Sequence, residues 1–491
     1  MKVEGGKMRK RKLMLISPML HQGGFERVCV TTARLLQPYF DVTIVIFDSA
    51  NIAYDVEGLS IIDIQMGVRK GKLQKILNII RRSRKVRKLK KEMQPEIAYS
   101  FGSTANMVNA FSKTGKEKVW LGLRNYTDVE EETKMRLLVK KADLIVCCSR
   151  DIEKSVKIKY KFNNTAVLYN LYDADTIRKE AAASDPPLPF SEEQKEPESK
   201  LYETESQFPA SAGNTKTFRY LVSMGRDDPM KGFWHMIKAF KLVHDQIPEA
   251  RLILMGAGTF QKYKTLAEQL KITDAIYFAG MRRDPYALLK YGEVYLLTSA
   301  NEGFPNALVE AMTLSLAPVS TNCLTGPAEI LVRNGDTASL NDQFTEKQKE
   351  KETPVIYGDY GIVVPEMQKE ENLDPADITE EERNLADTVI RLLQDEKLLQ
   401  SYRQTAARRA GDFTYEKYLE QYPDMDQYLE EFTYKFQKKI VKAWREKVII
   451  EGCMTVTDRG ITLAKPFRHK TLEERASEYN GGLMLDGEYD F

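Results

Sequence analysis

Short apolar runs alternate with longer segments along most of the 491 residues, and this alternation limits the folds open to the chain. The longer segments carry apolar residues at intervals of three and four, which predicts amphipathic helices. Strands that alternate with helices favour parallel sheets covered by helices. We expect strands at 12–17, 41–47, 59–64, 97–101, 118–123, 143–149, 166–170, 218–224, 251–255, 276–282, 294–297, 317–321 and 360–365.

A segment of different composition separates two such alternating regions. Residues 181–217 contain several prolines, many Glu, Lys and Ser, and few aliphatic residues, which is typical of a linker or a disordered insertion. The chain is long enough for two or three domains with substantial cores. We therefore expect an α/β protein with one domain at 1–180 and a second at 218–415.

Residues 301–312 place two carboxylates around a predicted helix start. Glu302 lies in a loop after an apolar run, and Pro305 suits the first helical position, where no N–H donor is needed. Asn306 and Glu310 are four residues apart and share one helix face. Helix-start N–H groups attract anions, and carboxylates accept hydrogen bonds from sugar hydroxyls. The stretch fits a polyol phosphate substrate, although solvated glutamates on a capped surface helix also explain it.

A second polar cluster follows the strand expected at 218–224. Gly225 and Arg226 come directly after that strand, and Lys231 lies five residues beyond Arg226, across a turn. Arg binds phosphate with its planar fork and Lys binds it as a point charge, so the two side chains can converge on one anion. Two unrelated surface cations are the alternative explanation.

Residues 301–312 closely resemble the Glu-x7-Glu signature of the retaining glycosyltransferases of family 4, which have the GT-B fold. Residues 225–232 resemble the family's Gly-Arg-x4-Lys-Gly motif, and residues 23–27 resemble its Gly-Gly-x-Glu-Arg loop. Residues 325–330 resemble its Gly-Pro-x-Glu-Ile segment. The resemblance covers residues 13 to about 440, apart from the insertion and a polar excursion at 334–353. It implies two Rossmann-like domains that face a central cleft.

The resemblance implies a role for each matching residue. Arg226 and Lys231 would neutralise the donor diphosphate, Glu302 would hold the donor sugar, and Glu310 would bind the donor ribose; these four form the expected catalytic group. A late helix at 416–445 would return to the first domain, which leaves 446–491 unassigned. The expected donor-binding residues are Gly23, Gly24, Arg124, Asn125, Gly225, Met281, Arg282, Gly303, Phe304, Pro305 and Asn306.

The implied activity is transfer of a sugar from a nucleotide-diphosphate donor to a glycan or lipid-linked glycan acceptor, with retention of configuration. The resemblance favours UDP-sugars and bacterial surface polysaccharide biosynthesis. Two alternatives stay open: a nucleotide-sugar epimerase or phosphorylase-like enzyme with the same cleft, and a catalytically silent scaffold in a polysaccharide assembly. The presence of every expected site residue counts against the silent scaffold.

Composition and spacing argue against other classes. The net charge is +2, and the five cysteines and four histidines show no metal-binding or redox spacing. Asp173–Asp175 and Asp424–Asp426 mimic a metal-binding Asp-x-Asp, but neither follows a suitable strand, so we expect no metal and no cofactor apart from the donor substrate. We also expect no nucleic-acid partner. The absence of a signal peptide and of a membrane-spanning apolar run predicts a cytoplasmic protein.

Residues 69–91 depart from this neutral balance, because they form a predicted helix dense in Lys and Arg. A solvated helix face explains the pattern, and so does attraction to anionic lipid at about 1 kcal/mol per basic residue. Nucleic acid is less favoured because no aromatic residues interleave. The lipid explanation predicts a protein lying peripherally on the inner face of the plasma membrane. The apolar residues at helical spacing are Leu73, Ile76, Leu77, Ile80 and Val86, and the expected lipid contacts are Arg81, Arg82, Arg84 and Lys85.

Overall fold

The structure is a computed structural model that describes residues 10–21, 23–67, 71–186, 188, 218–350 and 352–422 together with five short strands outside these ranges. It divides into one compact unit at 1–418 and another at 419–491. The short strands are β1 (Val3–Glu4), β2 (Lys7–Met8), β17 (Met454–Thr457), β18 (Gly460–Leu463) and β19 (Glu488–Tyr489). Strands β17, β18 and β19 form an antiparallel sheet within the second unit.

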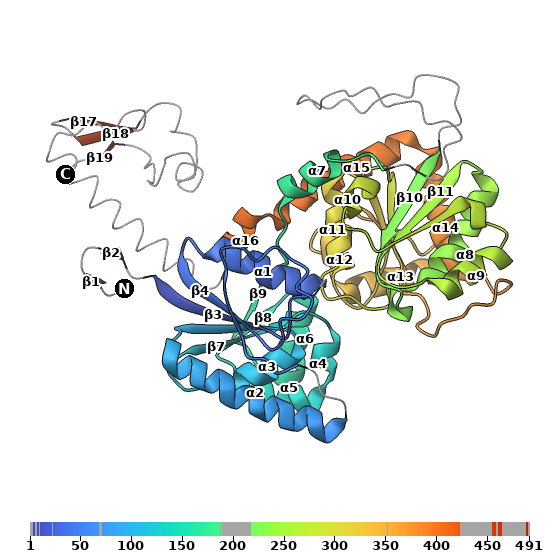
Figure 1. Cartoon of the computed structure of the whole chain (residues 1–491). Coiled ribbons are helices and arrows are strands. Elements are labelled where there is room, and N and C mark those ends of the chain that lie inside the picture. Colours follow the sequence, from blue (N-terminus) through green and yellow to red (C-terminus); the bar gives the residue numbers. More distant parts are fainter. Residues whose placement is uncertain are drawn as a thin grey trace. The chain divides into compact units, whose positions relative to one another are not determined.

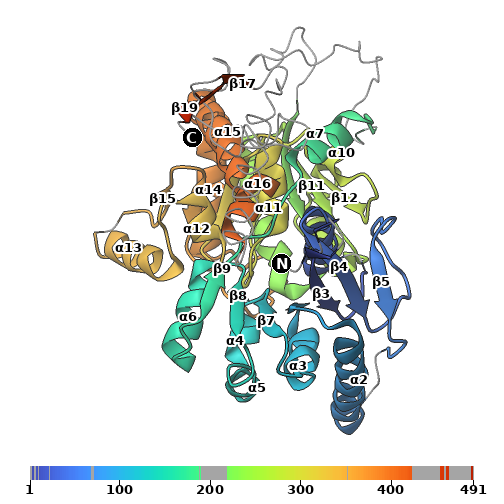
Figure 2. The same ribbon diagram turned by 90° about the vertical axis from the view of Figure 1, so that its left-hand side faces the viewer.

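The first sheet of the larger unit has seven parallel strands in the order β5-β4-β3-β6-β7-β8-β9. Its strand order reverses between β3 and β6. Figure 1 shows α1 on one face of this sheet and α2 and α3 on the other, and Figure 2 shows α2, α3, α4 and α6 in a row. The strands are β3 (Arg11–Ser17), β4 (Phe40–Ile46), β5 (Ser60–Asp63), β6 (Ile97–Phe101), β7 (Lys118–Leu123), β8 (Leu144–Cys147) and β9 (Thr165–Val167).

The second sheet has seven strands in the order β12-β11-β10-β13-β14-β16-β15. All neighbouring pairs are parallel except β15 with β16, and the strand order reverses between β10 and β13. The strands are β10 (Arg219–Met224), β11 (Ala250–Met255), β12 (Ile276–Gly280), β13 (Val294–Leu297), β14 (Ala317–Thr321), β15 (Ile356–Tyr357) and β16 (Ile362–Val364). Strands buried on both faces explain the near-continuous apolar runs of the sequence.

Helices connect the strands of both sheets. In the first half they are α1 (Gly24–Leu36), α2 (Lys72–Met93), α3 (Ser103–Phe111), α4 (Thr127–Glu130), α5 (Glu132–Leu138), α6 (Arg150–Tyr160) and α7 (Ala174–Ala182). In the second half they are α8 (Phe233–Gln246), α9 (Gln261–Gln269), α10 (Pro285–Leu289), α11 (Asn306–Thr313), α12 (Pro327–Leu331), α13 (Thr337–Lys349), α14 (Glu380–Gln394), α15 (Glu396–Ala410) and α16 (Tyr415–Gln421). Short 3-10 turns lie at Pro229–Lys231, Thr273–Ala275 and Gly411–Phe413. Each helix among the described residues is too short or too polar to span a bilayer.

Buried apolar residues from both sheets belong to one continuous core cluster. Phe304, two residues before α11, joins the two halves, because its ring lies 5.4 Å from that of Tyr169 and 5.2 Å from that of Phe413. Beyond Phe413 the chain meets the first half again: Tyr172 N donates to Phe413 O, and the Tyr418 hydroxyl lies 3.0 Å from Thr32 Oγ1. The core therefore holds the carboxyl ends of both sheets close to one another.

Several helix boundaries differ from the sequence predictions. Helix α11 begins at Asn306, so Pro305 precedes the helix instead of occupying its first position. The expected polar excursion at 334–353 contains α13, which the Asp336 side chain caps by accepting a hydrogen bond from Ser339 N at 3.0 Å. The single amphipathic helix that the sequence predicts at 385–399 is interrupted at Asp395, which separates α14 from α15 and caps α15 in the same way. Most of the expected returning helix at 416–445 lies outside the described residues.

Candidate active site

Several of the predicted site residues lie in loops at the two positions where strand order reverses. In parallel sheets, loops diverge at such a position and leave a crevice at the carboxyl ends of the strands, where ligands bind. The loop after β10 carries Arg226 and Lys231, and the loop after the adjacent β13 carries Glu302. In the first sheet, the loop after β3 leads to Gly23 and Gly24 at the start of α1.

Lys231 and Glu302 lie directly together. Lys231 Nζ donates to Glu302 Oε1 at 2.6 Å, although 71 residues separate them in the chain. Backbone contacts support the pair: Thr298 Oγ1 donates to the carbonyl of Lys231 at 3.1 Å, and Ala300 N donates to Met230 O at 2.9 Å. The ion pair holds a cation and a carboxylate in fixed positions at the strand ends.

Arg226 does not join Lys231 in this structure. Its side chain is 74% exposed, and Nη2 lies 3.9 Å from Asp228 Oδ2. The expected convergence of the two cations on one anion therefore requires Arg226 to move from its solvated position. A long, exposed side chain can make that movement without disturbing the core.

Glu310 faces the first half of the chain. It is buried, and its Oε1 accepts a hydrogen bond from Arg27 Nη2, while Arg27 Nη1 donates to the Tyr286 hydroxyl at 3.0 Å. The nearby Glu310 carboxylate raises the pKa of Arg27, against the lowering effect of burial. Arg27 was not among the predicted site residues, although its place at the end of the Gly-Gly-x-Glu-Arg loop, three residues after Gly24, was a usable signal.

Asn306 links the start of α11 to the first half of the chain. Its Oδ1 accepts hydrogen bonds from Asn170 Nδ2 and from the Tyr172 hydroxyl, both at 2.6 Å. A Cβ atom on Gly24 would lie 2.8 Å from Asn306 Nδ2, so this close approach favours glycine. Asn170 and Tyr172 were not predicted as site residues either, because no short sequence spacing relates them to Asn306.

Arg124 lies inside the first half, instead of pointing its guanidinium into the crevice. The side chain is buried, and it donates to Asn170 Oδ1 at 3.0 Å and to the Tyr99 hydroxyl. Its backbone, however, supports the Glu302 loop: a Cβ atom on Gly303 would lie 2.0 Å from Arg124 O and 3.1 Å from Asn125 Cα. The Arg124–Asn125 loop and the Glu302 loop therefore touch through backbone atoms.

The remaining predicted donor contacts lie at the ends of β10 and β12. Gly225 directly follows β10 and closely approaches the Lys231 side chain. Met281 is exposed directly after β12, the edge strand of the second sheet. Arg282 Nε and Nη2 donate to the two carboxylate oxygens of Asp284, each at 3.0 Å.

Glu26 is a buried carboxylate that the sequence prediction did not assign to the site. It lies in the first turn of α1, and its Oε2 has no hydrogen-bond partner among the described residues. Burial raises the pKa of the Glu26 carboxyl to about 7, and the charges of His21 and Arg226 only partly oppose this effect. Glu26 therefore titrates near neutral pH at the edge of the crevice.

Glu26→Gln is expected to stabilise the folded protein at pH 8 but hardly at pH 4.5. Below the ordinary value of 4.5 the carboxyl is protonated in both the folded and the unfolded chain. As pH rises towards 7, the unfolded chain loses this proton first, so wild-type stability falls by up to about 3 kcal/mol. Glutamine stays neutral and avoids that loss.

Chemical denaturation of wild type and variant at both pH values measures the difference. Glu57→Gln, which changes an exposed carboxylate, serves as the matched control. Equal stability of wild type and Glu26→Gln at pH 8 would contradict the burial of an ionisable Glu26.

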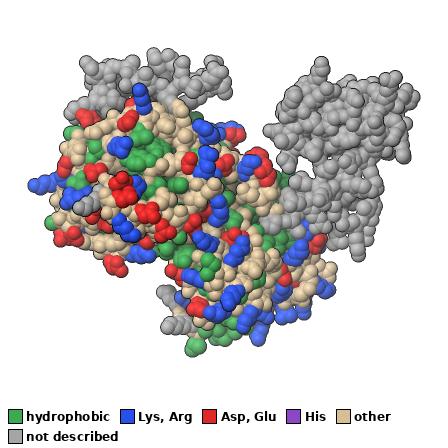
Figure 3. Space-filling model, turned by 180° about the vertical axis from the view of Figure 1, so that it is seen from behind, with side chains coloured by type: hydrophobic (Ala, Val, Ile, Leu, Met, Phe, Trp, Pro, Cys, Tyr) green, Lys and Arg blue, Asp and Glu red, His purple; other side chains and the backbone are tan. Residues whose placement is uncertain are grey.

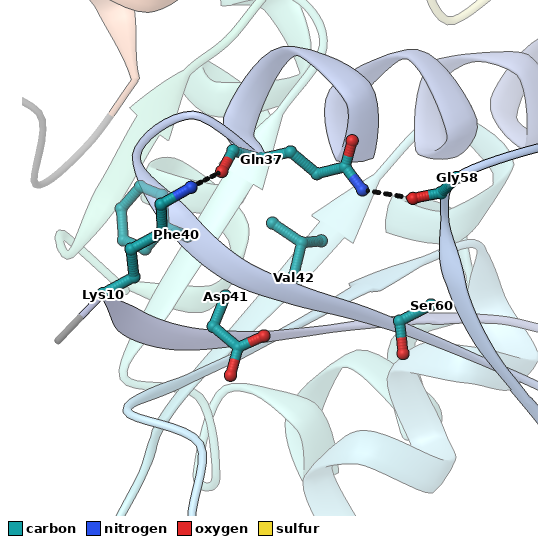
Figure 4. A pocket seen from close by; sticks show the side chains of 7 residues that line it. All are labelled: Lys10, Gln37, Phe40, Asp41, Val42, Gly58 and Ser60. Carbon is teal, nitrogen blue, oxygen red and sulfur yellow. Dashed lines mark hydrogen bonds between the residues drawn. The ribbon is translucent and has the colours of Figure 1, made fainter.

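An open hollow of about 510 Å³ lies away from this site (Figure 4). It adjoins Phe40 and Asp41 at the amino end of β4, opposite the carboxyl ends where ligands of parallel sheets bind. The lining residues are Lys10, Gln37, Phe40, Asp41, Val42, Gly58 and Ser60, and none is a predicted site residue.

Within the described ranges, no group of three or more His, Cys, Asp or Glu side chains could hold a metal ion. Asp173, the first residue of the Asp-x-Asp pattern at 173–175, caps α7 by accepting a hydrogen bond from Thr176 N at 2.8 Å.

Known proteins share both sequence and fold with this chain. The family described as glycosyl transferases group 1 matches residues 205–353. An uncharacterized glycosyltransferase of Methanocaldococcus jannaschii is 26% identical over 70% of this chain and 82% of its own length. The N-acetylgalactosamine-N,N'-diacetylbacillosaminyl-diphospho-undecaprenol 4-alpha-N-acetylgalactosaminyltransferase of Campylobacter jejuni is 21% identical over 65% of this chain and 83% of its own length.

Solved structures agree on the fold. Anabaena HepE in complex with UDP-glucose superimposes with a TM-score of 0.60, at 15% identity, over 86% of this chain and 99% of that one. Sucrose-phosphate synthase from Thermosynechococcus elongatus gives a TM-score of 0.60, at 14% identity, over 87% of this chain and 100% of that one. The chain therefore has the predicted α/β, two-domain GT-B fold, and its relatives support its assignment as a glycosyltransferase.

Proposed function

We propose that this chain is a retaining glycosyltransferase of family 4 that transfers a sugar from a UDP-sugar to a glycan or lipid-linked glycan acceptor during surface polysaccharide biosynthesis. The carrying observation is the Lys231–Glu302 ion pair at the point where the second sheet reverses its strand order, next to the start of α11. UDP is bound in the Anabaena structure, and the Campylobacter relative is named for a diphospho-undecaprenol acceptor. Both names support the proposal.

The proposed reaction depends on charge. Cleavage of the sugar–phosphate bond leaves negative charge on the diphosphate, which Lys231, a repositioned Arg226 and the free amides of α11 stabilise. Each such contact lowers the barrier by roughly 3 kcal/mol, by analogy with a single oxyanion donor. Glu302, already oriented by Lys231, holds hydroxyls of the donor sugar and stabilises positive charge on the ring. The diphosphate takes the acceptor proton, and Lys231, Arg226 and the helix amides take the place of a metal in neutralising its charge.

Donor binding must accommodate the Arg27–Glu310 pair. Glu310 is the proposed ribose ligand, and its Oε1 accepts from Arg27 before any donor is present. The ribose hydroxyls therefore donate to the other carboxylate oxygen or replace Arg27. Glu310→Gln is expected to weaken donor binding about tenfold to a hundredfold, since a hydrogen bond to a charged group contributes about 1.5–3 kcal/mol.

Isothermal titration with UDP and with UDP-sugars measures this loss. Glu117→Gln is the matched control, because Glu117 also forms a buried ion pair, with Lys90 at 3.0 Å, but at the amino end of β7, opposite the carboxyl ends of the strands where the crevice lies. If both variants bind the donor as wild type does, Glu310 is not the ribose ligand.

A turnover assay tests the reaction itself. The full chain is incubated in EDTA with a panel of nucleotide sugars and glycan or lipid-linked acceptors, and NMR determines the anomeric configuration of the product. Retention with release of UDP is the expected result. Product formed from donor alone indicates the epimerase alternative, and donor binding without turnover across the panel indicates a silent scaffold.

A further inference from the structure

Helix α2 exposes a row of large apolar side chains on its outer face. Leu73, Ile76, Leu77 and Ile80 are 77%, 56%, 44% and 42% exposed. Their spacing of three and four residues places them on one face over the first turns of the helix. A helix on the surface of a globular domain normally turns such a face towards the core, so this orientation is inverted.

The inner face of α2 explains the inversion, because polar side chains there satisfy backbone carbonyl groups. Asn78 Nδ2 donates to Gly67 O at 2.9 Å, Arg82 Nε donates to Met66 O at 2.9 Å, and Lys85 Nζ donates to Ile64 O at 2.7 Å. Lys90 forms a buried ion pair with Glu117. These contacts set the rotation of the helix and keep the apolar row outward.

The contacts on the inner face of α2 also correct the predicted set of lipid contacts. Arg82 is buried, with its guanidinium 4.5 Å from the centre of the Phe47 ring, and Lys85 is bonded to Ile64 O. Of the four cations expected to reach lipid, Arg81 and Arg84 are exposed and are not held in this way. Val86 is the one apolar residue of the predicted set that lies fully in the core of the first sheet.

Basic residues continue the outer face beyond the apolar row. Arg84, Arg87, Lys88 and Lys91 are exposed and follow Ile80 at intervals of three and four residues. Ten basic residues and one acidic residue, Glu92, make up the charges of α2. Figure 1 shows α2 at the lower end of the molecule, and Figure 3, which views the molecule from behind, shows both blue and green side chains at that end. The outer face is therefore apolar in its first half and cationic in its second.

We infer that this outer face of α2 docks on an anionic lipid bilayer, with the apolar row inserted between headgroups and the basic half on their phosphates. An apolar stripe followed by Lys and Arg suits the interface between acyl chains and anionic headgroups. A second copy of the chain fits poorly, because the contact would cover Arg84, Arg87 and their basic neighbours without matching acidic residues, since Glu92 is the one acidic residue of α2. The inference goes beyond sugar transfer and does not depend on it.

Sedimentation of the full chain with vesicles of phosphatidylglycerol and phosphatidylcholine tests the inference. Wild type is expected to bind vesicles rich in phosphatidylglycerol and to keep part of that binding in high salt, where charge is screened. Ile76→Gln/Leu77→Gln should lose the salt-resistant part, and Arg84→Glu/Arg87→Glu should lower partitioning at low salt at least tenfold. All four positions are exposed, so the variants are expected to fold.

Matched controls carry the same changes elsewhere on the first half of the chain. Leu137→Gln/Ile158→Gln removes two exposed apolar side chains, and Lys140→Glu/Lys141→Glu reverses two exposed cations; both should bind vesicles as wild type does. Wild type that stays in the supernatant, or α2 variants that sediment like wild type, would overturn the inference. A wild-type dimer that Ile76→Gln/Leu77→Gln dissociates, without loss of vesicle binding, would assign the face to a second copy instead. UDP binding should be unchanged in all these variants.

Discussion

Lys231→Ala is expected to lower the turnover number by roughly 10²-fold to 10³-fold. The variant removes one positive charge from the position where the leaving diphosphate gains negative charge, and removal of one oxyanion-type donor has effects of this size. Steady-state rates at saturating donor measure the loss. The structure also predicts a stability cost of about 1–2 kcal/mol, because Glu302 loses the cation 2.6 Å from its carboxylate.

Lys262→Ala separates the chemical effect from the structural one. Lys262 Nζ lies 2.7 Å from Glu371 Oε1, so this variant breaks a comparable ion pair in the same half of the chain. It should lose similar stability and keep wild-type turnover. If Lys231→Ala also turns over at the wild-type rate, Lys231 does not act on the leaving group and the assignment of the diphosphate site fails.

Gly303→Ala is expected to reduce kcat/KM by about a hundredfold and to destabilise the fold by roughly 1–3 kcal/mol. The added methyl would lie 2.0 Å from Arg124 O and 2.7 Å from the Arg124 carbonyl carbon, and both are backbone atoms that cannot rotate away. The Glu302 loop must therefore move by about 1 Å, which displaces Glu302 from its contact with Lys231. Donor kinetics and thermal unfolding of the purified variant measure both effects.

Gly411→Ala is the control for the glycine substitution. No heavy atom lies within 4 Å of a Cβ atom at Gly411, and its φ of −60° suits alanine. This variant should be as active as wild type and equally or more stable. Wild-type kinetics of Gly303→Ala would show that the two loops do not touch in the working enzyme.

Much of the site follows from local sequence signals. Glu302, Asn306 and Glu310 are placed by one loop and one helix start, and Arg226 and Lys231 by one strand end, so short-range spacing was enough to select them. Arg27 and Asn170 were not selected, since their contacts join segments far apart in the chain, and Glu26 was not selected because its burial depends on the tertiary structure. Arg27 to Glu310 spans 283 residues and Asn170 to Asn306 spans 136.

Periodicity has a further limit, which α2 illustrates. The spacing of Leu73, Ile76, Leu77 and Ile80 correctly predicted one apolar face, but it could not say whether that face meets the protein or its surroundings. The choice depends on which side chains satisfy the carbonyl groups of Ile64, Met66 and Gly67, and those groups belong to another segment. Arg82 and Lys85 supply the donors, so their side of the helix faces the protein, while Arg84, Arg87, Lys88 and Lys91 stay exposed on the same face as the apolar row.

Hydrophobic periodicity and turn residues act within about twenty residues, so they were enough to predict the thirteen parallel strands of the two sheets and the α/β class, but not β15. Three features became known from the folded chain alone: the strand orders that bring the loops after β10 and β13 together, the pairing of Arg27 with Glu310, and the outward rotation of α2. Each of these depends on contacts between distant segments, whose geometry no local pattern encodes.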